Sequence, residues 1–192
     1  MGWLDDAERL DLAIYAAVAS TPTPALDDAM RRLSHAADYS RLSIASAALL
    51  AATGGRRGRR AATGGLVALG VTATVINVAV KPLARRRRPD RLLGEVPLAR
   101  HVRMPRSGSF PSGHSAGAFA FATGVGHADP LAAVPLRALA AAVAYSRVHT
   151  GVHYPADVLG GALIGTALAG LTKHVGESRR GRAGRHRPDR VI

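Results

Sequence analysis

The stretch that decides the fold reads KPLARRRRP at residues 81–89, PSGH at residues 111–114 and SRVHTGVHYPAD at residues 146–157. These segments carry charged and polar side chains, yet apolar runs lie on either side of them. Cations, histidines and a carboxylate therefore stand at the ends of apolar segments, where packed helices can bring them together. The candidate functional residues are Lys81, Arg88, Ser112, Gly113, His114, Arg147, His153 and Asp157.

Five apolar runs surround these segments and predict an all-α, integral membrane helical bundle. They occupy residues 42–53, 61–80, 116–125, 131–145 and 155–171. A helix crosses about 30 Å of hydrocarbon with about 20 residues, a length that the run at 61–80 reaches. Hydrophobic residues make up 47% of the chain but aromatic residues only 4%, because alanine, leucine, valine and glycine dominate. Such small residues favour close packing of helices in a membrane.

The alternation of about five spanning helices predicts that all three polar segments lie on one membrane face. Residues 56–60 and the basic C-terminal residues then lie on the opposite face. Cytoplasmic segments are usually the more basic ones, so this topology predicts that the polar segments face the outside of the cell. Residues 81–112 are also rich in arginine. Arginines that would bind phosphate are therefore left out when the basic residues of the two faces are compared.

The chain divides into three parts, at residues 1–38, 39–174 and 175–192. The first part is acidic, and the spacing of its apolar residues predicts amphipathic helices over about residues 5–19 and 24–37, at the interface or against the bundle. The second is the predicted transmembrane domain. The third is rich in arginine with almost no apolar residues, which predicts disorder. The first residues do not show the pattern of a cleaved signal peptide.

The formal net charge of +13 raises the question of nucleic acid binding. The arginines lie between apolar runs, however, a layout typical of segments that face anionic lipid headgroups. We therefore expect the lipid bilayer as a partner and no nucleic acid. Only Lys81 and Lys173 are lysines among the 26 basic residues, which singles out Lys81. The absence of cysteine excludes disulfides and thiolate metal sites.

The candidate residues supply what phosphoryl transfer requires, which is positive charge around the phosphate oxygens, a nucleophile and a proton donor. The side chains of Lys81, Arg88 and Arg147 supply the charge. Ser112 and Gly113 precede an apolar run, and the free amides at a helix start would add hydrogen-bond donors. These five residues form the predicted phosphate-binding group.

His153 and His114 have different predicted roles in the reaction. His153 and Asp157 are four residues apart, so they share a face if a helix begins near Tyr154. A carboxylate bound to one ring nitrogen fixes the tautomer and leaves the other as a nucleophile. His153 is therefore the predicted nucleophile, forming a phosphohistidine. His114 is the predicted proton donor for the leaving oxygen, and the base for the water that follows.

The three segments resemble the motifs of the type 2 phosphatidic acid phosphatase family, which shares a helical core with vanadium haloperoxidases and bacterial acid phosphatases. The resemblance covers about residues 40–172 and includes every motif identity: Lys81, Arg88, Pro89, Pro111 to His114, Ser146, Arg147, His153 and Asp157. It implies the same division of roles, with no metal or other cofactor. Membrane members of the family often have six spans, whereas this chain is predicted to have five.

The resemblance further implies a membrane lipid with a phosphate headgroup as substrate. Phosphatidate, phosphatidylglycerol phosphate and polyprenyl phosphates or diphosphates are all used within the family. The heavy use of arginine and alanine suggests a bacterium of high GC content. Polyprenyl carriers of envelope sugars, including polyprenyl-linked sugar phosphates, are then attractive substrates in the plasma membrane. The sequence predicts no oligomeric state.

Four other interpretations fit parts of the pattern. Residues 113–117 match G-x-S-x-G, but that serine hydrolase motif follows a strand and residues 107–111 read as a loop. His149, His153 and Asp157 repeat every four residues and could bind zinc, although Gly151 and Pro155 interrupt a helix there. The third is a haloperoxidase. The fourth is a lipid-binding protein without activity, but such a protein would not need His114, His153 and Asp157 together.

Overall fold

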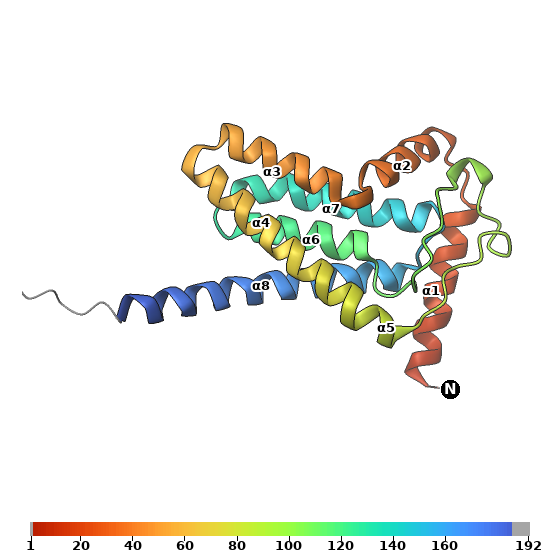
Figure 1. Ribbon diagram of the computed structural model, residues 1–192. Coiled ribbons are helices and arrows are strands. Elements are labelled where there is room, and N and C mark those ends of the chain that lie inside the picture. Colours follow the sequence, from red (N-terminus) through yellow and green to blue (C-terminus); the bar gives the residue numbers. More distant parts are fainter. Residues whose placement is uncertain (1, 186–192) are drawn as a thin grey trace, which may run out of the picture.

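The computed structural model describes residues 2–185 and is helical throughout its regular structure (Figure 1). The α-helices are α1 (Trp3–Ser20), α2 (Pro24–Ala36), α3 (Arg41–Thr53), α4 (Gly55–Val75), α5 (Lys81–Ala84), α6 (Gly113–Gly126), α7 (Pro130–His149) and α8 (Pro155–Arg185). Three short elements join them, namely the 3-10 helices η1 (Asp38–Ser40) and η3 (Leu98–Arg100) and the π-helical turn η2 (Ile76–Val80).

The centre of the bundle is α6, which contacts α4, α7 and α8. Its alanines at 116, 120 and 122 are inaccessible to solvent. The helix α3 packs against α4, and α4 continues through η2 into α5 as one rod. Figure 1 shows α8 extending beyond the other helices at one end of the bundle, whereas α1 and the connection from 85 to 112 lie at the other end. The predicted all-α helical bundle is confirmed.

Glycines allow the helices around α6 to approach closely. A methyl group added to Gly124 of α6 would lie 2.6 Å from the carbonyl oxygen of Gly64 in α4. One added to Gly161 of α8 would lie 2.5 Å from the carbonyl oxygen of Ser112. Both distances are too short for real contacts, so the two interfaces require glycine. This is the packing expected where helices associate in a membrane through small residues.

Three helical segments of the described chain are long and apolar enough to cross a membrane, namely Gly55–Ala84, Pro130–His149 and Pro155–His174. The other two core helices, α3 and α6, have 13 and 14 residues. At 1.5 Å per residue each is about 20 Å long, shorter than the hydrocarbon core. The five core helices follow the five predicted runs, but only three of them meet the length and composition of a span.

The N-terminal part forms the two predicted helices, α1 and α2, with nearly the predicted bounds. A buried polar network joins them to the bundle. The fully buried Arg100 donates hydrogen bonds to the carbonyl oxygens of Val18 and Thr21, and its Nε lies 2.8 Å from Asp27 Oδ1. The same carboxylate lies 2.9 Å from His149 Nε2 on α7. The helices therefore pack against the bundle, which was one of the two placements that the sequence predicted.

Three local predictions differ from the structure. Residues 56–60 lie inside α4, because a turn at Gly54 suffices to reverse the chain and arginine is a good helix former. Ser146 and Arg147 belong to the last turn of α7 rather than to a link. The helix α8 continues to Arg185, into the segment whose composition predicted disorder, while residues 186–192 lie outside the described part.

Candidate active site

The end of the bundle beside α1 brings the three motif segments together. Lys81 lies at the start of α5, residues 112–114 at the start of α6, and Arg147 in the last turn of α7. The backbone amide of Ser112 donates to the carbonyl oxygen of Asp157 across 2.9 Å, which joins the start of α6 to the first turn of α8. Residues far apart in the sequence thus share one buried site.

The His153 ring lies between a carboxylate and a guanidinium. Its Nδ1 is 3.3 Å from Asp157 Oδ2, and its Nε2 is 3.1 Å from Arg88 Nη1. A guanidinium can only donate a hydrogen bond, so Nε2 accepts and the ring proton lies on Nδ1, facing the carboxylate. Nε2 therefore carries the lone pair, as a nucleophile requires.

Burial keeps this ring uncharged. His153 is only 1% exposed, and burial, opposed by the hydrogen bond to Asp157, lowers its pKa from 6.5 to about 4. At neutral pH the imidazole is therefore neutral. The lone pair on Nε2 is then available for attack on a phosphorus atom.

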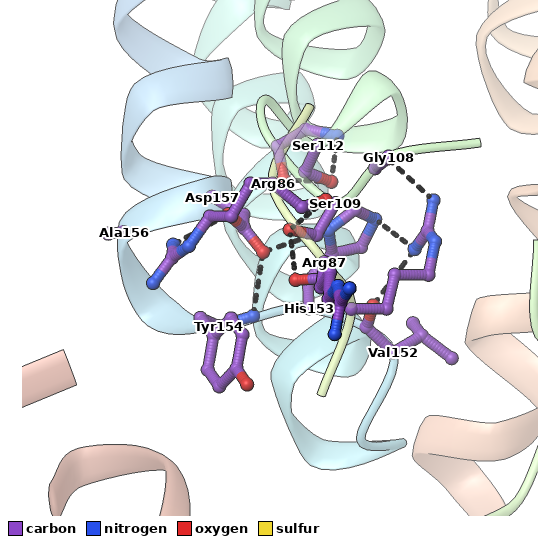
Figure 2. A network of polar contacts seen from close by, with 12 residues as sticks. Arg86, Arg87, Gly108, Ser109, Ser112, Val152, His153, Tyr154, Ala156 and Asp157 are labelled. Carbon is purple, nitrogen blue, oxygen red and sulfur yellow. Dashed lines mark hydrogen bonds and ion pairs between the residues drawn. The ribbon is translucent and has the colours of Figure 1, made fainter. Parts of the chain in front are cut away.

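The Asp157 carboxylate is fully buried, and both of its oxygens are bound. Oδ2 accepts from the Tyr154 amide at 2.9 Å in addition to facing His153, and Oδ1 accepts from Arg86 Nη1 at 2.8 Å (Figure 2). The other terminal nitrogen of Arg86 lies 2.6 Å from Asp11 Oδ2 on α1. The carboxylate is thus fixed with one oxygen toward the histidine.

Asp11 has a second role at the same point. Its Oδ1 accepts from the backbone amide of Ala156, in the first turn of α8, across 2.7 Å. The Arg86 guanidinium also lies over the Tyr154 ring, 4.5 Å from its centroid. A carboxylate from α1 therefore both balances the charge of Arg86 and binds the start of the helix that carries Asp157.

In the connection from residue 85 to 112, Ser109 binds the backbone of the arginines. The Ser109 amide donates to the carbonyl oxygen of Arg86 and its hydroxyl to that of Arg87, both across 2.9 Å. Residues 85–90 have no helical structure, and side chains alternate along an extended chain. Arg86 and Arg88 accordingly point inward, while Arg87 is exposed.

Three cations surround the space in front of His153. The Arg88 guanidinium is held by the carbonyl oxygens of Ser107, Gly108 and Val152. Arg147 is 2% exposed and donates through Nη1 to Ser34 Oγ of α2. Its buried Nε has no hydrogen-bond partner among the described residues. A buried donor without an acceptor is costly, and a phosphate oxygen would satisfy it.

Lys81 and the start of α6 complete the predicted phosphate-binding group. Lys81 Nζ lies 3.3 Å from Ser107 Oγ. A methyl group added to Gly113 would lie 3.5 Å from Lys81 Nζ, so glycine keeps open the space beside the ammonium. Ser112 caps α6, accepting from the Ser115 amide, and the first amides of the helix face this end of the bundle.

His114, the predicted proton donor, pairs with a residue that sequence analysis did not identify. Its Nε2 lies 3.0 Å from Asp38 Oδ1, in the short element η1 between α2 and α3. Arg86, Asp11, Ser34 and Ser109 were also missed. The motif spacing singled out Arg88 in the run of arginines at 85–88 and gave Arg86 no role. The alternation of Arg86 with Arg88 was the one local signal that could have identified it.

The zinc and serine hydrolase interpretations do not fit the geometry. His149 binds Asp27, whereas His153 binds Asp157, so these side chains belong to separate networks. Within the described residues no group of histidine, aspartate and glutamate is arranged to hold a metal ion. Ser115 lies inside α6 and donates to Ser112 Oγ, with no strand before it.

A cavity of about 240 Å³, lined by both apolar and polar side chains, opens beside Lys81 and His114. Lys81, Gly113 and His114 lie at its polar part, and side chains of α3, α4, α6 and α7, such as Leu69 and Phe121, form its walls. A ligand in this cavity can place apolar atoms between the helices and a charged group beside the ammonium of Lys81.

Comparisons with known proteins agree with this geometry. The family model of the PAP2 superfamily matches residues 62–180. The decaprenylphosphoryl-5-phosphoribose phosphatase of Mycobacterium tuberculosis is 34% identical over 179 residues, covering 90% of this chain and 94% of that protein. The enzyme of the same name from Mycolicibacterium smegmatis is 34% identical over 166 residues, covering 82% and 84%. The chain therefore belongs to the PAP2 superfamily.

Two crystal structures have the same fold. The transmembrane PAP2 type phosphatidylglycerolphosphate phosphatase from Bacillus subtilis is 27% identical, with a TM-score of 0.66 over 90% of this chain and 87% of that one. LpxE from Aquifex aeolicus is 26% identical, with a TM-score of 0.69 over 86% and 95%. The protein is thus a membrane phosphatase of the PAP2 type that hydrolyses a lipid phosphate, as its sequence predicted.

The network around Asp157 predicts unequal effects for two neighbouring arginines. We expect Arg86→Gln to lower kcat roughly 10- to 100-fold with little change in KM, because the carboxylate loses the group that orients it. The exposed Arg87→Gln is the matched control and should stay within about twofold. Steady-state kinetics of both purified variants would test this. Equal effects of the two substitutions would contradict the assigned role of Arg86.

Proposed function

We propose that this protein removes the terminal phosphate from a polyprenyl-linked phosphorylated sugar in the bacterial plasma membrane. The observation that carries the proposal is the buried His153 and Asp157 pair, with Arg88 at the ring's Nε2 and with Arg147 nearby. This chain is also 34% identical to a decaprenylphosphoryl-5-phosphoribose phosphatase, of which the match covers 94%. The cavity beside Lys81 supports an amphiphilic substrate, since its lining combines apolar side chains such as Leu69 and Phe121 with the ammonium of Lys81.

The proposed reaction proceeds through a phosphohistidine. Lys81, Arg88 and Arg147, with the amides at Ser112 and Gly113, bind the phosphate oxygens. His153 Nε2 forms a bond to phosphorus as the bond to the leaving oxygen breaks, and His114 gives that oxygen a proton.

A water molecule completes the cycle. It attacks phosphorus, His114 takes its proton, and the bond between phosphorus and Nε2 breaks to release inorganic phosphate. In the first step, as Nε2 bonds to phosphorus, the imidazole of His153 gains positive charge, which the Asp157 carboxylate stabilises across its 3.3 Å contact; the ring becomes neutral again when that bond breaks. No step in this scheme requires a metal ion.

A substrate panel tests the proposal. The purified protein in detergent, with chelator present, should release phosphate from a polyprenylphosphoryl-5-phosphoribose faster than from phosphatidate, phosphatidylglycerol phosphate or a polyprenyl monophosphate. His153→Ala should lower the rate at least about 10³-fold, the order expected for a lost nucleophile. Faster release from phosphatidate would redirect the substrate assignment. A rate that survives in His153→Ala would overturn the mechanism, and a rate lost to the chelator would restore a metal.

We also propose that the site lies on the outer face of the membrane. At the site end Arg86, Arg88 and Arg100 are bound within the protein. Arg85, Arg87, Arg103 and Arg106 are exposed there, together with the acidic side chains of Asp5, Asp6 and Glu8 in α1. At the opposite end Arg56, Arg59 and Arg60 are exposed. The opposite end also holds the last part of α8, whose sequence includes Arg179, Arg180, Arg182 and Arg185. It is therefore the more basic end, which the positive-inside rule assigns to the cytoplasm.

Single cysteines report the orientation directly, because the chain contains none. Leu98→Cys lies at the site end and Thr53→Cys at the other, both at exposed positions. We expect a membrane-impermeant maleimide to label Leu98→Cys in intact cells and Thr53→Cys only after lysis. The reverse pattern would place the site in the cytoplasm.

A further inference from the structure

A second histidine and carboxylate pair lies opposite the first. His114 Nε2 is 3.0 Å from Asp38 Oδ1. The ring is about a quarter exposed and the Asp38 side chain about a third. Within the described residues no other hydrogen bond reaches the His114 ring, so its Nδ1 is unengaged. Asp38 lies outside the three motif segments.

The backbone around Asp38 is strained. Tyr39 and Ser40 follow it with φ of 56° and 59°, in the left-handed region that residues other than glycine rarely adopt. Such a conformation costs free energy and persists only where the surroundings impose it. It forms a kink between α2 and α3, where η1 contacts α6.

The helix before η1 is fixed at the same end of the bundle. Ser34 of α2 accepts a hydrogen bond from the buried Arg147 of α7, and Asp27 binds His149 and Arg100. The position of Asp38 is therefore set by buried contacts of α2 on one side and by the strained kink at Tyr39 and Ser40 on the other. The carboxylate is held beside His114 by the fold as a whole.

The charges around His114 explain why a carboxylate is needed there. Burial and the nearby cations Arg147 and Lys81 lower the pKa of His114 to about 4, and Asp38 opposes them. Without a carboxylate, the protonated ring would face two cations with no opposite charge. A proton donor must hold its proton when the leaving oxygen departs. A bound phosphate adds negative charge, which, like Asp38, raises the pKa of His114.

We propose that Asp38 is the positioning residue of the proton-donating histidine. It accepts the Nε2 proton of His114, so that the protonated ring gives its Nδ1 proton to the leaving oxygen as the bond from that oxygen to phosphorus breaks. The neutral ring, still bound to Asp38 through Nε2, then takes a proton from water at Nδ1 in the second step. This assignment rests on the proposed function.

The two pairs would then work through opposite ring nitrogens. His153 uses Nδ1 for its carboxylate and keeps Nε2 for phosphorus, whereas His114 uses Nε2 for its carboxylate and keeps Nδ1 for the proton. Each carboxylate stabilises positive charge on its own ring. The second carboxylate comes from the N-terminal part of the chain, which thereby joins the active site.

Dependence on the leaving group separates this role from a structural one. An aryl phosphate such as 4-nitrophenyl phosphate departs without a proton, whereas an alkyl phosphate such as phosphatidate needs one. We expect Asp38→Asn to lower kcat/KM for the alkyl phosphate roughly 10- to 100-fold and for the aryl phosphate less than about threefold. Asp38→Glu, which keeps the charge, should recover part of the loss. Asp28→Asn changes a half-exposed side chain of α2 that pairs with Arg31 and Arg32; it is the matched control and should change neither rate.

Equal losses on the two substrates would mean that Asp38 only maintains the structure, and unchanged or faster alkyl cleavage would mean that it assists no proton transfer. Either result overturns the inference. Should Asp38→Asn fold poorly, a double-mutant cycle decides: in the background of His114→Ala, replacing Asp38 should cost no further alkyl activity. An additional loss would also overturn it. Failure of the proposed function is distinguishable, because the wild-type protein would then show no activity that depends on His153.

Discussion

The buried carboxylate of Asp157 is the constraint on which the rest of the site depends. A charge with no access to water is stable only where hydrogen bonds and opposite charge replace the lost hydration. Arg86, the Tyr154 amide and the His153 ring do so here, and Asp11 in turn balances Arg86. The catalytic pair is therefore the centre of a network that reaches from α8 through the 85–112 connection to α1.

That network also explains why a helix outside the bundle belongs to the enzyme. By sequence alone, α1 is an acidic amphipathic helix that could rest on any membrane surface. Its Asp11 instead binds both Arg86 and the start of α8, while the carbonyl oxygens at its end bind Arg100. The close packing of glycines around α6 brings the ends of α6 and α8 together, and the N-terminal helices cover the end where they meet.

The sequence predicted the five core helices, the two N-terminal helices and the meeting of the motif segments, because apolar runs and motif spacing are local signals. It did not predict the contacts of Asp11, Asp38 and Arg86, since each joins segments more than 70 residues apart and has no local pattern. Residues 56–60 were assigned to a loop because their charge outweighed their helix propensity. The roles of His153 and His114 remain predictions, now supported by their positions.

The most direct test of the account is to identify the residue that carries phosphate during turnover. The protein would be mixed with a substrate labelled with ³²P, quenched in alkali, in which phosphohistidine survives, and digested for mass spectrometry. The account predicts a phosphate on His153 that accumulates within the first turnover and is absent from His153→Ala. A phosphate on any other residue, or full turnover with no phosphorylated protein at any time, would contradict it.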